Sequence, residues 1–320
     1  MPRIYNDDGT FEDVEHINWY LLAGPDIYVE PRTTPLCHVP KMTKGSAPID
    51  GGNLLLSPAE REELIKKCPL AEKYIRQFLG AEEFIHNKKR YCLWLVDCPP
   101  DELRKMKPVY ERVKKVREFR LKSKRDGTRK VAEFPQLFAE IRQPKESYIS
   151  IPEVSSERRK YIPMDFLSPE IIPSNKLQVI PNADLWHFGI LTSSVHMAWT
   201  KTVCGRLTSR IDYSAKLVYN NFVWKQMTPT QFIKLVESSK KILDARKNYP
   251  NASLADLYDE IAMPRDLRAA HKLNDKVVMD IYGFDESMTD EEIAISLLEA
   301  YKFVSDYKDG KTADIDKEFS

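Results

Sequence analysis

Apolar residues recur at every third or fourth position along several stretches of the chain, which is the spacing of one face of an α-helix. A helix is predicted to begin after Ser57, because Ser57-Pro-Ala-Glu60 supplies an N-cap, a proline at the first helical position and a capping-box glutamate. Its apolar positions continue to Leu79. The same spacing predicts further helices at residues 109–125 and 192–203. Three more are predicted to open at Thr228-Pro229, at Pro264 and at Thr289, which Glu292 caps. In the helix that opens at residue 228, the apolar positions predicted to face inward are Phe232, Ile233, Val236 and Leu243.

Shorter extended runs lie between the first helices, at residues 84–85, 91–96, 137–141, 148–152, 161–162 and 177–180. Turn-forming residues separate them, so much of this region is predicted to be loop. The fold class is therefore α+β, with a loop-rich mixed α/β domain followed by a small all-helical domain. We place the segment boundaries at 1–22, 23–188, 189–284 and 285–320.

The composition is that of a globular protein, with 42% hydrophobic and 30% charged residues. The five cysteines are scattered and odd in number, which argues against a disulfide scaffold and fits a reducing compartment. No second pair joins Cys92 and Cys98 to complete a zinc site, so no metal is predicted. No apolar run approaches the roughly 18 residues that span a bilayer, and the polar N-terminus is unlike a signal peptide. A cytoplasmic location without a membrane partner is expected.

Charge is distributed unevenly along the chain. Between His86 and Lys130 sixteen Lys and Arg face six Asp and Glu, whereas from Phe284 to Ser320 eleven acids face four lysines. A basic region of this kind suits a polyanion such as nucleic acid, and an acidic end suits a solvated tail. A solvated helix surface explains the basic stretch without any partner.

The sequence lacks a complete catalytic motif. A methyltransferase core needs a glycine-rich loop after a strand to hold its methionine-derived cofactor, and no Gly-x-Gly occurs among the eleven glycines. Asp97-Cys-Pro-Pro100 lacks the adjacent prolines and the aromatic residue of an amino-methyltransferase motif, so we interpret it as the end of a strand. No catalytic residue and no cofactor site are predicted in this segment.

Nine short strings, in this order along the chain, resemble the C-terminal half of MmeI-like enzymes, which are single-chain restriction–modification proteins and related adenine-specific DNA methyltransferases. The strings are Ile17–Asp26, Asp50–Leu56, Gly80–Phe84, Tyr91–Asp97, Glu140–Pro144, Ser155–Arg159, Phe188–Ser194, Tyr219–Phe222 and Ser253–Tyr258. Residues 285–320 lie outside the resemblance.

The resemblance implies a role for each segment. Residues 1–22 would be a linker from an upstream catalytic half, 23–188 a DNA target recognition domain, 189–284 a helical C-terminal domain and 285–320 an acidic helical tail. The missing half would hold S-adenosylmethionine and the methyltransferase chemistry, and double-stranded DNA would be the partner. The methyltransferase core would be in the same chain, or in a separate one if the subunit is split; a specificity or scaffold subunit, and an adaptor that binds only protein, remain the alternatives.

A DNA-reading domain positions itself on phosphates and reads base edges with Arg, Lys, Asn and Gln. The basic stretch supplies most of the phosphate candidates: Lys114, Lys115, Arg120, Lys124, Arg125 and Lys160. Three loop clusters supply the base-reading candidates: Arg142, Gln143, Arg158, Arg159, Asn175, Lys176, Gln178 and Asn182. Strand alternation predicts Lys176, Gln178 and Ile180 on one face. Internal salt bridges of Arg142 and Glu157 are the competing interpretation.

Several other residues invite a simpler interpretation. His196, and the indoles of Trp186, Trp199 and Trp224, are predicted to be core side chains rather than ligands or base-stacking groups. Tyr219-Asn-Asn-Phe222 could contact a phosphate or the catalytic half, or form a tight turn.

Overall fold

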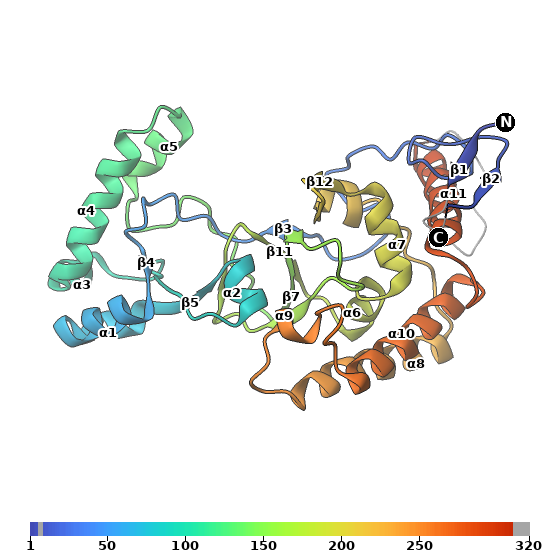
Figure 1. The fold of residues 1–320 in the computed structure, drawn as a ribbon. Coiled ribbons are helices and arrows are strands. Elements are labelled where there is room, and N and C mark those ends of the chain that lie inside the picture. The colour runs from blue at the N-terminus through green and yellow to red at the C-terminus, as the bar shows by residue number, and fades with distance from the viewer. Residues whose placement is uncertain (6–8, 310–320) are drawn as a thin grey trace. The chain divides into compact units, whose positions relative to one another are not determined.

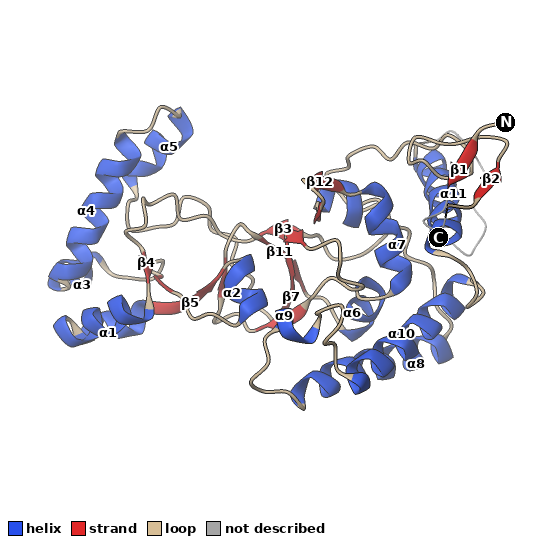
Figure 2. Cartoon of the chain, in the orientation of Figure 1, coloured by secondary structure: helices blue, strands red, loops and turns tan. Residues whose placement is uncertain are grey.

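The structure is a computed structural model that describes residues 1–5 and 9–309 (Figures 1 and 2). Contacts divide the chain into two compact units that interleave along the sequence. Unit 1 comprises Met1–Met42, Glu153–Met164 and Ala183–Ser320, and unit 2 comprises Thr43–Pro152 and Asp165–Asn182. The boundary predicted at residues 188 and 189 separates sequence segments rather than contact units, and it remains a prediction. Within the described ranges no helix is both long and apolar enough to cross a membrane.

Unit 2 contains two four-stranded sheets. The first has the order β10-β5-β6-β4, with β4 Leu55–Leu56, β5 Ile75–Leu79, β6 Tyr91–Leu93 and β10 Ile172–Pro173. The second has the order β3-β11-β7-β9, with β3 Thr43–Lys44, β7 Tyr148–Pro152, β9 Asp165–Leu167 and β11 Leu177–Pro181. The strands predicted at 148–152 and 177–180 are thus confirmed, whereas 137–141 and 161–162 form no named strand.

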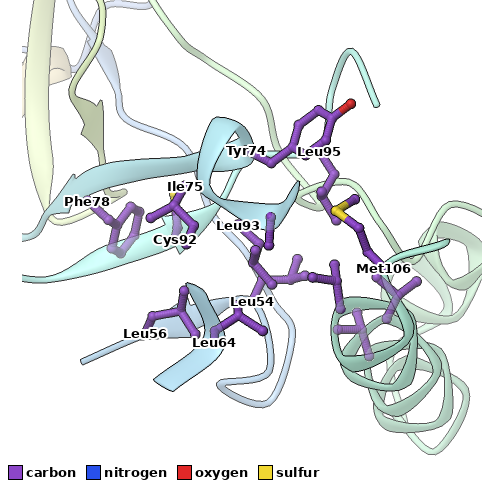
Figure 3. Packing of buried hydrophobic residues seen from close by; sticks show 14 of the residues in the cluster. Leu54, Leu56, Leu64, Tyr74, Ile75, Phe78, Cys92, Leu93, Leu95 and Met106 are labelled. Carbon is purple, nitrogen blue, oxygen red and sulfur yellow. The ribbon is translucent and has the colours of Figure 1, made fainter. Parts of the chain in front are cut away.

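Unit 2 contains both α-helices and 3₁₀ helices. They are α1 Pro58–Lys67, the 3₁₀ helix η1 Pro69–Tyr74, α2 Ala81–His86, α3 Pro100–Lys105, α4 Lys107–Leu121, α5 Asp126–Lys130 and the 3₁₀ helix η2 Val131–Glu133. Figure 3 shows the core formed by side chains of the sheet, of α1 and of Met106, which precedes α4. The predicted capping box of α1 is confirmed, since the Ser57 hydroxyl accepts from the Glu60 amide and the Glu60 carboxylate accepts from the Ser57 amide.

Two predictions in this region are wrong. The helix expected to continue to Leu79 ends at Lys67, because Pro69 lacks an N–H and disfavours the helical conformation at Cys68, which has φ −149° and ψ 81°. Its last apolar residues form β5 instead. Phe84 and Ile85, expected in a strand, belong to α2, whose start is fixed by the Glu83 carboxylate accepting from the Gly80 amide.

Unit 1 is mainly helical. Its helices are α6 Leu185–Leu191, α7 Ser194–Val203, the π-helix η3 Ala215–Tyr219, α8 Pro229–Lys247, α9 Leu254–Leu257, α10 Arg265–Tyr282 and α11 Asp290–Lys308. Its strands are β1 Arg3–Tyr5 and β2 Phe11–Asp13, which pair with each other, and β8 Val154–Ser155, β12 Gly205–Leu207 and β13 Arg210–Asp212, which form a sheet of order β12-β13-β8. The predicted starts of α8, α10 and α11 are confirmed to within one residue.

Helix α8 turns a different face inward from the one predicted. Phe232 and Ile233 are exposed, whereas Leu235, Ser238, Ser239 and Ile242 are buried. The small serines allow α8 to lie close against α6 and α10 (Figure 1), and a Cβ added at Gly189 of α6 would come within 2.2 Å of the Ser239 hydroxyl. Close packing with hydrogen-bonded serines therefore decides the face, and the periodicity of large apolar residues does not reveal it.

Candidate nucleic-acid interface

The exposed face of α4 and the loop after it carry most of the predicted phosphate contacts. Lys114, Lys115, Lys124 and Arg125 are all exposed. Lys114 pairs with Glu111 at 2.8 Å, one turn back on the helix. Lys115, Lys124 and Arg125 form no ion pair within the described residues, so their charges face solvent and are available to an anion.

Arg120 is a correction to the predicted phosphate set, because its side chain is fully buried. Its guanidinium donates to the carbonyl oxygens of Pro48, Ile49, Val131, Phe134 and Leu137, at 2.7–3.1 Å. Burial lowers the pKa of Arg120. The residue holds two loops against α4, whereas its neighbour Phe119 is exposed.

Two of the predicted base-reading loops meet at a single point of unit 2. The Arg142 amide donates to the Ser46 hydroxyl at 2.9 Å, and the Asn175 amide donates to the Ser46 carbonyl at 2.9 Å. Gly45 permits this approach, since a Cβ there would lie 2.5 Å from the carbonyl oxygens of Pro173 and Ser174. Asn175 and Lys176 thus come near Arg142, although they are distant in sequence.

The side chains on these loops are not equally available. Arg142 pairs with Glu140 at 2.7 Å, so the competing interpretation, an internal salt bridge, holds for this residue. The side-chain amide of Gln143 donates to the carbonyls of Pro169 and Ile171 at 2.7 and 3.0 Å. These bonds use the side chain to fix the loop, which contradicts its assignment as a base-reading residue. Lys176 remains exposed.

Gln178 is a second correction. It lies in β11 between β3 and β7, and both faces of β11 are covered, so Gln178 and Ile180 are buried together. The predicted exposed face does not exist, because alternation along a strand gives a polar face only where one side of the sheet meets solvent. Asn182, just after the strand, is exposed with a left-handed φ of 57°.

The third loop, residues 156–160, belongs to unit 1 and begins directly after β8. Arg158 and Lys160 are exposed and Arg159 is partly buried. Burial lowers the pKa of Arg159, and nearby Asp259 opposes that shift. The next residue, Tyr161, fixes the end of the loop: its hydroxyl donates to Asp275 of α10 at 2.6 Å and its ring stacks on His271 with the centroids 4.1 Å apart.

A buried polar network extends this anchor. Asp275 accepts a hydrogen bond at 2.8 Å from the backbone amide of Ser194, which is the first residue of α7. Arg246 of α8 donates to the Met164 carbonyl at 2.7 Å and to the Tyr258 hydroxyl, which lies 2.9 Å from His271 Nε2. The segment that carries the loop is therefore held to several helices of unit 1, which gives its exposed arginine a rigid base.

A β-hairpin beside this loop adds cations that the sequence analysis missed. Strand β13 pairs with β8, with Ile211 opposite Ser155, and β12 returns to a tip at Thr208 and Ser209. Arg206 donates to the Lys201 carbonyl at 3.0 Å, at the end of α7, and so braces the tip. Leu207 and Arg210 lie opposite each other and are exposed. The pattern Gly205-Arg-Leu-Thr-Ser-Arg210, with polar turn residues between two arginines, was the signal available in the sequence.

A pocket of about 670 Å³ lies at the base of the 156–160 loop. Its wall includes Arg158, Arg159, Lys160, Arg268 and the acids Asp259 and Glu260. Lys201, also in the wall, pairs with Asp290 at 2.9 Å. Cations and acids both line the pocket, so the loop presents positive charge within a surface of mixed charge.

The remaining residues that the sequence analysis singled out make contacts within the protein. His196 is buried with Nε2 2.8 Å from the Tyr213 hydroxyl, and burial lowers the pKa of His196 to about 3. Trp199 and Trp224 are buried, and Trp186 is partly buried. In the string Tyr219–Phe222 the side-chain amides of Asn220 and Asn221 donate to the carbonyls of Arg32 and Glu30, which fixes an N-terminal segment. No group of three or more His, Cys, Asp or Glu placed to bind a metal occurs in the described part of the chain.

The comparisons with known proteins agree with the predicted resemblance. Residues 23–226 match the MmeI target recognition domain and residues 227–307 match the MmeI C-terminal domain. DNA methyltransferase A of Bacillus subtilis (strain 168) is 36% identical over 295 residues, which are 92% of this chain and 33% of that protein. A structure of the Type IIL restriction-modification enzyme MmeI in complex with DNA is 42% identical, with a TM-score of 0.90, over 94% of this chain and 40% of that one.

The chain thus spans a third to two-fifths of the length of these relatives. The two family models together cover most of it, and the structural match extends through both units. On these findings the chain belongs to the MmeI family, of which it comprises the target recognition domain and the C-terminal domain.

Proposed function

We propose that this chain recognises a short duplex DNA sequence on behalf of an S-adenosylmethionine-dependent, adenine-N6-specific DNA methyltransferase of a restriction–modification system. The observation that carries the proposal is the likeness to MmeI in complex with DNA, at 42% identity and a TM-score of 0.90 over 94% of the chain. Double-stranded DNA is the partner, and the methyltransferase core is proposed to lie in the same polypeptide, as the match to one third of DNA methyltransferase A supports.

Sequence reading is assigned to the 156–160 loop together with the β12–β13 hairpin. A two-stranded ribbon fits the major groove, which is about 12 Å wide. Arg158 and Arg210 offer exposed guanidiniums, which suit the O6 and N7 atoms of guanine, and Leu207 suits a thymine methyl group. Their backbone is fixed by strand pairing and by the Tyr161–Asp275 bond, so the side chains can be held in register with base edges.

Phosphate binding is assigned to Lys115, Lys124 and Arg125 of unit 2. Exposed cations without an ion pair inside the protein contribute most to the affinity for DNA phosphates, because they give up no existing ion pair on binding. Lys114 contributes less, since its ammonium already contacts Glu111. Asn175, Lys176 and Asn182 remain candidates on the same unit.

The chemistry is assigned to the core and not to this chain. S-adenosylmethionine supplies the methyl group when it is bound there, and the target adenine would leave the base stack to reach it. What this chain contributes is affinity for one sequence and a fixed position on the duplex.

Selection from a random pool of duplex DNA tests the proposal. The intact chain is incubated with duplexes that carry a randomised interior, and bound molecules are sequenced after several rounds. We expect one short motif to be enriched, with affinity that falls steeply as salt rises. Retention of no DNA at low salt would reject DNA recognition; retention without an enriched motif would reject sequence reading.

A further inference from the structure

The string Ile17–Asp26, which the recognition of DNA leaves without a role, forms a braced turn in unit 1. The Asn18 side-chain oxygen accepts from the amides of Tyr20 and Leu22 at 2.9 and 3.1 Å, and the Asn18 amide donates to the Leu22 carbonyl at 2.9 Å. The Tyr20 hydroxyl accepts from the Val29 amide at 3.0 Å. The turn is therefore fixed by its own hydrogen bonds and by the segment that follows.

This fixed turn presents large apolar side chains to solvent. Trp19 is 72% exposed and Leu21 is 78% exposed, and Tyr28 nearby in sequence is 65% exposed. Leu21 also has a φ of 63°, a conformation that favours glycine and costs a leucine free energy. A strained leucine held outward in a braced turn is poorly explained by folding of the unit alone.

Charge around the turn limits what can cover it. From Gly9 to Glu30 the sequence has five Asp and Glu and no Lys or Arg. Such a surface repels DNA phosphates, and two copies of it would repel each other. An exposed apolar turn within an acidic stretch of the sequence fits a protein surface of neutral or basic character instead.

We propose that the turn bearing Trp19 and Leu21 docks onto the methyltransferase core that works with this chain. The proposal rests on the proposed function, in which recognition and methyl transfer are divided between two parts of one protein. About two-thirds of DNA methyltransferase A lies outside the matched region, so a large surface is available there. A base can be delivered to a catalytic site only if the two parts are held in fixed register, and permanent interfaces of that kind are built on apolar contacts.

The test uses a graft in which this chain replaces the matched third of Bacillus subtilis DNA methyltransferase A. Methyl transfer to DNA and thermal unfolding are measured for the parental graft, for Trp19→Asp with Leu21→Asp, and for Ile233→Asp with Ile261→Asp. The last pair is the matched control, because those side chains are 57% and 91% exposed in the same unit. We expect the first pair to lower methylation at least tenfold and to split one unfolding transition into two, and the control to change neither.

Leu21→Gly is a second variant, in which a loss of methylation would not be explained by loss of folding. Glycine relieves the positive φ, so the isolated chain should melt at a higher temperature while the graft methylates more slowly. Methylation within twofold of the parent for the Trp19 and Leu21 variants would overturn the proposal, as would a folded parental graft that binds DNA but does not methylate it. DNA binding by the isolated chain is measured beside these and reports on the proposed function separately.

Discussion

The exposed cations of α4 in unit 2 and those of the loop–hairpin surface in unit 1 are positioned by different means. On α4, lysines extend from a helix surface, and only the backbone beneath them is fixed, through the buried Arg120. In unit 1, Arg210 projects from the paired strand β13 and Arg158 from the loop that follows β8, and these segments are fixed by Arg206 and Tyr161. Flexible lysines suit phosphate binding, which needs charge but little geometry, whereas base reading needs a fixed direction.

Arg120 and Arg210 extend the comparison to a single residue type. Both occur in sequence segments rich in positive charge, yet one makes five bonds to backbone carbonyls and the other faces solvent. The residue type alone does not determine the role of an arginine; the carbonyl groups that surround it do.

The two units should differ most in their response to acid. His196 and His271 are buried in unit 1, where burial lowers the pKa of His196 to about 3 and that of His271 well below its usual value, whereas His86 is the one histidine in the sequence of unit 2 and is exposed. Below pH 6.5 the unfolded chain binds protons that these folded histidines exclude, so stability present above pH 6.5 is lost as the pH falls towards 3. For His196 alone this predicts a loss of about 2 kcal/mol from unit 1 at pH 5, and His271 adds to the loss in the same direction.

Trp94 is the one tryptophan of unit 2, so fluorescence of a Trp94→Phe variant reports on unit 1. Urea unfolding at pH 7 and pH 5 gives the two free energies. Equal stability of unit 1 at both pH values would remove this difference between the units.

Replacing Arg120 by Met should destabilise the packing of the two loops that Arg120 holds against α4. The substitution leaves five carbonyls without their donor, and we expect a loss of about 3 kcal/mol or more in unit 2. Lys115→Met on the exposed side of the same helix should change stability by less than about 0.5 kcal/mol. Similar urea midpoints for the two variants would mean that the buried and exposed cations of α4 do not differ in their structural role.

Replacing Arg158 or Arg210 by Ala should relax sequence recognition. Loss of a base-reading side chain should cost about 1–3 kcal/mol of binding free energy on the correct motif and much less on other sequences. Selection from the random duplex pool, repeated with each variant, should show one degenerate position while the melting temperature stays unchanged. An unchanged motif would locate the reading surface elsewhere, with Lys176 and Asn182 of unit 2 as the next residues to replace.

The smallest effect per residue is expected for substitutions of the exposed cations on α4 and on the loop after it. Changing Lys124 and Arg125 to Ala should weaken binding to all duplexes alike and flatten the slope of log affinity against log salt by about one unit per lost contact. The pair Lys66→Ala with Lys67→Ala removes the same charge from α1 and serves as the control. A motif altered by the Lys124 and Arg125 changes would contradict the division between positioning and reading.

Much of the architecture followed from local sequence signals. Capping residues predicted the starts of α1, α8 and α11, and apolar spacing predicted α4, α7 and α10. Apolar periodicity failed where another local signal overrode it, as at Pro69, which ended a helix, and at Phe84, where the Glu83 capping bond began one. The face of α8 depended on small serines packed against Gly189, which apolar periodicity does not register.

By itself the sequence determined which segments are helical, where positive charge gathers and which family the ordered strings resemble, because capping, periodicity and charge act between residues close along the chain. Only the tertiary structure decided which polar side chains are available. It buried Arg120 and Gln178, committed Gln143 to a loop, and brought the β12–β13 hairpin beside the 156–160 loop. The physical reason is that burial and hydrogen-bond partners come from distant segments, and a polar group inside the protein must be satisfied by whatever carbonyls or amides those segments bring to it.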